Sequence, residues 1–107
     1  MVQNALQRAL ILVKDGSLSI DRNGCIWRHR STSPSDKRPL PRRAESVGGK
    51  GYLRMMLWFD GALHGVGAHR VVWAHFNGNI PPGQQINHLD LNKQNNHPGN
   101  LALVSGA

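Results

Sequence analysis

Cysteine is nearly absent from this sequence of 107 residues, which holds only Cys25. A single thiol cannot form a disulfide within the chain, and such scarcity is typical of proteins in a reducing cytoplasm. The sequence also lacks any apolar run near the roughly 18 residues of a membrane-spanning helix. Its short apolar run at residues 9–13 has no signal-peptide cleavage pattern. These absences predict a cytoplasmic protein without a membrane partner.

Acidic residues are also scarce, at six against thirteen lysines and arginines, and the formal net charge is +7. The excess is confined to residues 22–54, where nine cations accompany only Asp36 and Glu45. A basic block beside neutral segments predicts a surface for a polyanion such as nucleic acid. The alternative is a solvated loop that only keeps the protein in solution. The cations expected to contact nucleic acid are Arg28, Arg30, Lys37, Arg38, Arg42, Arg43, Lys50 and Arg54.

With 39% hydrophobic residues, the chain supports one domain with a modest core. Apolar residues at helical spacing predict helices at 2–14 and 68–77. The second helix carries Ala68, Val72 and Phe76 on one stripe, and Asn77-Gly78 stops it. Helices mixed with hairpins predict an α+β fold.

Turn signals divide the rest of the chain into hairpins and one irregular arm. Asn23-Gly24 predicts a tight hairpin whose second strand, 25–30, directs Arg28, His29 and Arg30 outward. Residues 31–43 contain three prolines and four cations without periodicity, and we expect a flexible arm. Alternation at 52–59 predicts a strand that faces the core with Leu53, Met55, Leu57 and Phe59 and then turns back into 62–66.

The residues that carry chemistry lie near the carboxyl end. His88 follows apolar Ile86 on a short strand, a loop rich in asparagine comes next, and Asn100 opens the returning strand. An imidazole is a suitable general base near physiological pH. We expect the side-chain carbonyl of Asn100 to hold one ring nitrogen so that the other faces water. Side chains of this loop bond their own backbone in turns, and those expected to stiffen it are Asp90, Asn92, Asn95 and Asn96.

An ordered series of residues over 51–104 resembles the HNH endonucleases of phages and mobile introns. The series is His69-Arg70-Val71-Val72-Trp73, Phe76-Asn77-Gly78, Ile80-Pro81, Gly83, Asn87-His88, Asn92-Lys93, Asn95-Asn96 and Asn100-Leu101. The resemblance implies a ββα-metal nuclease that hydrolyses double-stranded DNA with one divalent ion, magnesium first and manganese or another ion as alternatives. It implies His88 as the general base, Asn100 as the residue that orients it, Asn87 as a metal ligand and His69 in a supporting role.

The sequence departs from the family at the metal site. Position 87 is often aspartate in such enzymes, whereas Asn87 offers a neutral amide oxygen. The family's second strand is followed by a helix with the other metal ligand, and the three residues after Val104 are too few for one. We therefore expect an HNH hairpin truncated before its final helix. A reduced ligand set, a dimer or partner protein that completes the site, and a loss of cutting all remain open.

The resulting hypothesis divides one compact domain into two parts. Residues 1–50 form the helix, hairpin and basic DNA-contacting arm, and residues 51–107 form the nuclease core. The favoured function is a nicking DNA endonuclease, encoded by a phage or prophage and active in the bacterial cytoplasm. The alternatives are a catalytically inactive DNA-binding module on a decayed HNH scaffold and a protein-binding inhibitor. A zinc site is not favoured, because the five histidines of 64–97 lack cysteine pairs and tight ligand spacing.

Overall fold

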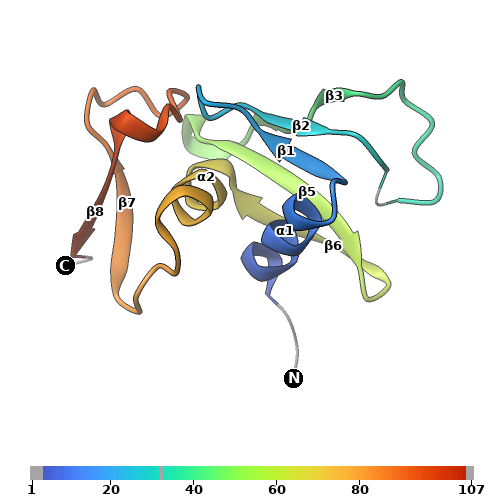
Figure 1. The fold of residues 1–107 in the computed structure, drawn as a ribbon, viewed down its shortest axis with the longest axis horizontal. Coiled ribbons are helices and arrows are strands. Elements are labelled where there is room, and N and C mark those ends of the chain that lie inside the picture. The colour runs from blue at the N-terminus through green and yellow to red at the C-terminus, as the bar shows by residue number, and fades with distance from the viewer. Residues whose placement is uncertain (1–3, 32, 106–107) are drawn as a thin grey trace.

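The computed structural model describes residues 4–31 and 33–105 and confirms the α+β class (Figure 1). Three antiparallel sheets follow the orders β1-β2-β3, β4-β5-β6 and β7-β8. The elements are α1 (Ala5–Lys14), β1 (Leu18–Ile20), β2 (Ile26–Arg28), β3 (Arg42–Arg43), β4 (Glu45–Val47), the 3-10 turn η1 (Gly49–Gly51), β5 (Leu53–Phe59), β6 (Ala62–Gly67), α2 (Ala68–Asn77), β7 (Gln84–His88), the 3-10 turn η2 (Pro98–Asn100) and β8 (Leu101–Ser105).

Helix α1 begins at a capping box. The side chain of Asn4 accepts a hydrogen bond from the Gln7 backbone N–H at 2.8 Å, and the Gln7 side chain accepts one from the Asn4 N–H at 3.1 Å. Two otherwise unpaired N–H groups are satisfied in this way. Ala9 and Leu12 bury the inner face of the helix. Residues 2 and 3 of the predicted helix lie outside the described residues.

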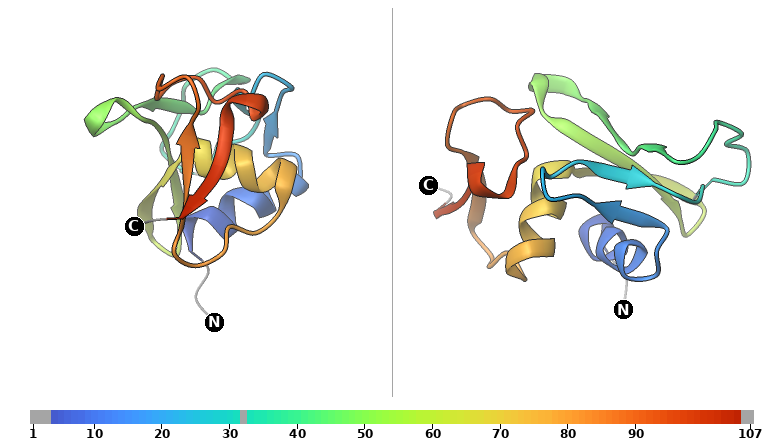
Figure 2. Two further views of the ribbon diagram at one scale, coloured as in Figure 1. Left: turned by 90° about the vertical axis from the view of Figure 1, so that its left-hand side faces the viewer. Right: turned by 45° about the horizontal axis from the view of Figure 1, so that its top comes forward.

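The long hairpin β5–β6 forms the centre of the molecule. Met55, Leu57 and Phe59 are buried and the residues between them are exposed, as the alternation predicts. Helix α2 packs beside this hairpin and carries the β7–β8 hairpin on its other side, as Figures 1 and 2 show. Ile86 and Leu101 join the same hydrophobic cluster as Val71. The strand that ends in His88 is thus anchored in the core.

The basic block, residues 22–54, differs from several predictions. Strand β2 ends at Arg28, whose side chain is buried and donates from Nη2 to the Met56 carbonyl oxygen at 3.1 Å. The outward placement expected for Arg28 is therefore wrong. The end of the expected arm, Arg42–Arg43, is strand β3, because its backbone completes a ladder with β2. Strand β4 was not predicted, since its burial follows no alternation that a sequence pattern would show.

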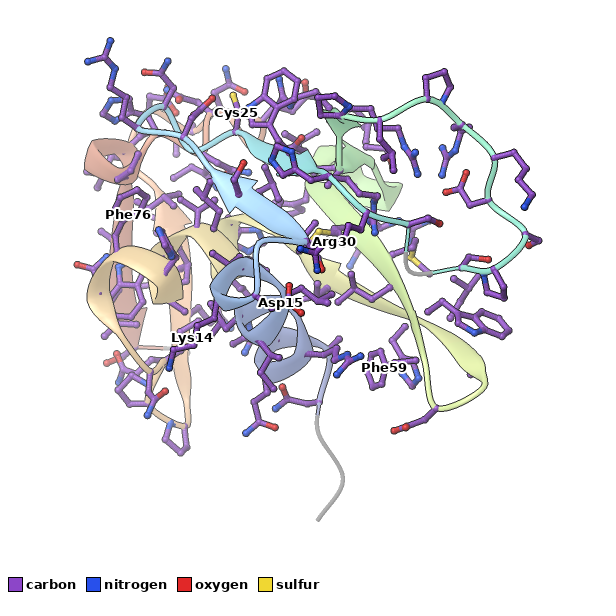
Figure 3. The ribbon with its side chains drawn as sticks, turned by 45° about the vertical axis from the view of Figure 1, so that its right-hand side comes forward. Lys14, Asp15, Cys25, Arg30, Phe59 and Phe76 are labelled. Atoms are coloured by element: carbon purple, nitrogen blue, oxygen red, sulfur yellow. The ribbon has the colours of Figure 1, made fainter. Side chains whose placement is uncertain are left out.

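Two further side chains are placed differently from their sequence pattern. Phe76 is 46% exposed, and Val71 takes the buried position beside Val72 on α2. Figure 3 shows Phe76 at the rim of the molecule and Arg30 close to Asp15 after α1. The hydrophobic stripe of α2 is therefore rotated toward Val71. In the described part of the chain, no helix has the length and apolar character needed to cross a membrane.

Candidate active site

His88 is the last residue of β7, where it pairs with Leu101 of β8. Its side chain is 4% exposed, and its Nε2 lies 2.8 Å from the Oδ1 atom of Asn96. An amide oxygen only accepts hydrogen bonds, so Nε2 carries the hydrogen and Nδ1 carries the basic lone pair. Within the described residues, Nδ1 of His88 has no hydrogen-bond partner. The ring is fixed in position and keeps one nitrogen available as a base.

Asn100 does not make the contact expected of it. Its Oδ1 accepts from the Asp90 N–H at 3.1 Å, and its Nδ2 donates to Asp90 Oδ1 and to the Asn95 carbonyl oxygen, each at 2.9 Å. The amide that holds His88 belongs to Asn96, which is 5% exposed. Asn100 instead closes the base of the loop, because it ties both of the loop's arms together.

Asp90 organises the loop between His88 and Asn100. Its carboxylate accepts from the Asn92 N–H at 2.8 Å and from Asn95 Nδ2 at 2.9 Å, besides the bond from Asn100. Hydrogen bonds from Asn95, then Asn100 and Asn92, hold the pKa of Asp90 below its ordinary value. The loop hydrogen bonds expected of Asp90 and Asn92 are thus formed, and they stiffen the loop that carries Asn96.

Three rings from separate parts of the chain meet beside the site. The ring centroids of His69 and His88 are 5.3 Å apart, and Tyr52 lies 5.3 Å from His69 and 5.9 Å from His88. Burial, together with the nearby His88 and Arg70, lowers the pKa of His69 to about 4. Its Nδ1 is buried without a hydrogen-bond partner in the described structure. His69 is therefore neutral at physiological pH and packs as an aromatic ring.

Replacement of His69 by phenylalanine is expected to reduce the loss in the free energy of unfolding that occurs at acidic pH. The pKa of His69 is about 4 in the folded chain and near 6.5 when unperturbed. Neutral His69 therefore stabilises the folded chain fully at a pH above the pKa that it has in the unfolded chain. This stabilisation is lost as the pH falls toward 4, because the unfolded chain binds the proton first. After allowance for the partial exposure of His69, the free energy of unfolding of the wild type should fall by about 2 kcal/mol between these two pKa values.

Urea denaturation at pH 7 and pH 4.5 checks this prediction. His69→Phe retains the ring contact with Tyr52 and is expected to lose less stability on acidification than the wild type. The exposed His75 offers the matched control His75→Phe, which should keep the wild-type difference. An unchanged acid limb in His69→Phe would show that another group causes the pH dependence.

The metal site is the weakest part of the arrangement. Asn87 is exposed on β7, and neighbouring strand positions face opposite sides of a hairpin, so its side chain and that of His88 diverge. Among residues 4–31 and 33–105, three or more His, Cys, Asp or Glu side chains never gather closely enough to hold an ion. Hard divalent ions bind six or more oxygen ligands. One neutral amide oxygen does not fit that requirement, and these residues do not form a complete metal centre.

Ion pairs occupy part of the basic block. Asp36 pairs with Arg42 at 2.5 Å and with Arg38 at 3.0 Å, and Glu45 pairs with Arg43 at 2.6 Å. Hydrogen bonds and charge, chiefly from Arg38, lower the pKa of Asp36. These ion pairs fold the arm back onto β2–β3. The exposed predicted cations that lie outside these pairs are Arg30, Lys37, Lys50 and Arg54.

The side chain of Lys93 connects the His88 loop with the backbone of the basic block. The Nζ of Lys93 donates to the Lys50 carbonyl oxygen at 2.8 Å and lies 4.9 Å from the centre of the Tyr52 ring. A pocket of about 280 Å³ beside Tyr52 and His69 is also lined by Arg70 and Gln84. The ammonium group of Lys93 therefore lies over Tyr52, whose ring is 5.9 Å from that of His88.

Part of the chain is similar to known proteins. Residues 66–107 match the profile of the HNH endonucleases. Over this segment the chain is similar to the HNH endonucleases. The chain is also 49% identical over 37 residues to the SPbeta prophage-derived HNH homing endonuclease YosQ of Bacillus subtilis (strain 168). Its structure is similar to that of the HNH homing endonuclease I-HmuI, with 25% sequence identity and a TM-score of 0.62.

These matches cover only part of each relative. The aligned part is 35% of this chain and 21% of the prophage relative. The similarity to I-HmuI covers 84% of this chain and 47% of that protein. The structure of I-HmuI was described for its DNA binding and cleavage. The chain thus spans less than half the length of either relative, and the HNH segment includes His88, Asn96 and Asn100.

Two members of the site escaped the sequence analysis. Tyr52 was not predicted to belong to the site, and Asn96 was assigned to loop stiffening alone. A sequence signal existed for Asn96, since an amide eight residues after His88 sits in the same loop. No local pattern indicated Tyr52, because it precedes β5 and approaches His69 and His88 only in the folded chain.

Proposed function

We propose that this chain is the nuclease part of an HNH-type DNA endonuclease that hydrolyses phosphodiester bonds and nicks one strand. The observation that carries the proposal is the buried His88, held through Nε2 by Asn96 with Nδ1 left free of protein partners. A fixed imidazole with one free nitrogen has the geometry of a general base. The HNH family of residues 66–107 supports the same chemistry.

The role of His88 is to accept a proton. Nδ1 takes one proton from water as the water oxygen forms a bond to phosphorus. The bond from phosphorus to the 3′ oxygen then breaks, and the departing oxygen keeps the electron pair and takes a proton from solvent. Asn96 stabilises the resulting imidazolium, because its amide oxygen faces the ring N–H throughout.

The proposed hydrolysis also requires a metal ion. We propose a divalent ion, with magnesium as the first candidate and manganese as the second, and Asn87 as the ligand that this chain supplies. The other ligands then come from water, from DNA phosphate or from a partner chain. A divalent ion supplies charge stabilisation to a phosphodiester under attack.

DNA binding is assigned to the exposed cations of the basic block. Backbone phosphates are contacted through Arg30, Lys37, Lys50 and Arg54, which gives affinity with little sequence information. Arg38, Arg42 and Arg43 add to this field only in part, because Asp36 and Glu45 offset their charge. The buried Arg28 supports the sheet instead.

One His88 per chain accounts for a nick, since a double-strand break needs two sites or two successive events. The prophage origin of the Bacillus relative supports a phage or prophage protein that acts in the bacterial cytoplasm. A dimer would bring two such sites to one duplex.

Supercoiled plasmid tests the proposed function directly. The wild-type protein is expected to convert it to the open-circular form with magnesium or manganese, and EDTA should stop the reaction. Binding of the same DNA should weaken steeply with salt, because cations displace condensed counterions. Salt-sensitive, EDTA-indifferent binding without nicking in any divalent metal would instead identify a non-catalytic DNA-binding module, a role that the incomplete metal site favours.

A further inference from the structure

The turn of the β1–β2 hairpin touches the loop that holds His88. Gly24 is buried at this turn, and a Cβ atom added there would lie 1.8 Å from the Asn96 carbonyl oxygen and 2.5 Å from its carbonyl carbon. Such distances leave no space for any side chain. Figure 2 shows the same approach, with the tip of the β1–β2 hairpin beside the loop that precedes β8. The backbone of Asn96 is therefore in direct contact with an element far away in the sequence.

The turn itself is rigid because Asp21 organises it. Its Oδ1 accepts from the Asn23 N–H at 2.9 Å and from the Cys25 N–H at 3.0 Å. Its Oδ2 accepts from the Trp27 indole N–H at 3.1 Å. The positive φ of +82° at Gly24 lets the chain turn toward Asn96 at this point.

The turn is also joined to the basic block. The Arg43 guanidinium lies 5.6 Å from the Trp27 ring centre and pairs with Glu45 at 2.6 Å. The other oxygen of Glu45 accepts from the Ile26 N–H at 2.8 Å. Contacts therefore run without a break from the arginine strand β3, through the hairpin, to the Asn96 backbone.

We propose that the β1–β2 turn positions the general base, with Gly24 as the positioning residue that presses Asn96 onto His88. The inference rests on the proposed role of His88 and assigns the N-terminal part a task beyond DNA binding. Asn96 holds the ring through one 2.8 Å bond, and its Nδ2 has no partner among the described residues. With so few side-chain bonds of its own, Asn96 depends on the backbone contact for its place.

Gly24→Ala tests the proposal, and Gly61→Ala is its matched control. Both glycines have positive φ, +82° and +74°, so both substitutions strain the backbone. Only the first would strike another residue, since a Cβ at Gly61 meets nothing within 4 Å. At saturating DNA, Gly24→Ala is expected to lower the nicking rate about tenfold or more, while DNA affinity stays within about twofold. Gly61→Ala should keep both values near wild type.

The imidazole nitrogen-15 shifts of His88, recorded without metal or DNA at one fixed alkaline pH, provide a second readout. The wild type and Gly61→Ala should show the Nε2–H tautomer, and Gly24→Ala should show a mixture of tautomers. An unchanged His88 signal in folded Gly24→Ala would overturn the proposal, even if its nicking were slow. A wild type that never nicks would refute the nuclease function but leave this readout intact.

Asp21→Ala covers the case in which Gly24→Ala does not fold. It removes the bonds that stiffen the turn without adding any atom against Asn96. The expected result is the same tautomer mixture in a smaller proportion. A pure Nε2–H tautomer in this variant would show that Asn96 keeps its place without the turn.

Discussion

Replacement of His88 by alanine is expected to abolish nicking while DNA binding survives. Loss of a general base lowers a hydrolytic rate by about 10²- to 10⁴-fold. The cations proposed to contact DNA lie on other parts of the chain, so affinity in a gel-shift assay should change by no more than about twofold. The measurement compares single-turnover nicking of supercoiled plasmid by the variant and the wild type at equal occupancy.

Chemical rescue distinguishes lost chemistry from lost structure. His88 is 4% exposed, so its removal leaves a space beside Asn96 that free imidazole fits. Added imidazole should restore part of the nicking rate in His88→Ala and leave the wild type unchanged. His75→Ala, at an exposed position on α2, is the matched control and should cut normally. Full activity in His88→Ala would exclude His88 as the base.

Asn96→Ala is expected to have the second-largest effect on nicking. The substitution removes the oxygen that fixes the His88 ring and its tautomer. Residues that orient a reacting histidine are worth about 10- to 100-fold in comparable sites. Because Asn96 acts only through His88, the double variant His88→Ala/Asn96→Ala should be no slower than His88→Ala alone.

Asn100→Ala provides the contrast within the same loop. Asn100 makes three hydrogen bonds to Asp90 and Asn95 and none to His88 among the described residues. Its loss should lower the free energy of unfolding by about 1–3 kcal/mol, measured by urea denaturation. Nicking should fall less than in Asn96→Ala once both variants are compared in the folded state. A larger loss in folded Asn100→Ala would return the orienting role to Asn100.

Most of the secondary structure follows from local patterns. Alternation identified β5, the spacing of apolar residues identified α1 and α2, and Asn23-Gly24 identified the first hairpin. These signals act between residues a few positions apart, where sequence patterns are informative. Strands β3 and β4 were missed because two or three residues carry no period, and their pairing with β2 and β5 stabilises them.

The candidate site also could be predicted only in part from the sequence. His88 could be identified from its strand, its loop and its family resemblance. The choice between Asn96 and Asn100 could not, because both amides lie in one polar loop and only its folded path decides which one reaches the ring. Arg28 shows the same limit, since a cation in a basic block was expected outside and is buried against Met56.

The sequence by itself determined the order of helices and hairpins, the basic block and the histidine that we propose as the general base. These depend on composition and on short-range periodicity, which any single chain displays. The tertiary structure alone decided that Asn96 holds His88, that Asp36 and Glu45 offset three arginines, and that Gly24 presses against Asn96. Each of these is a contact fixed by how loops and elements pack in three dimensions, and packing depends on the whole fold rather than on neighbours in the chain.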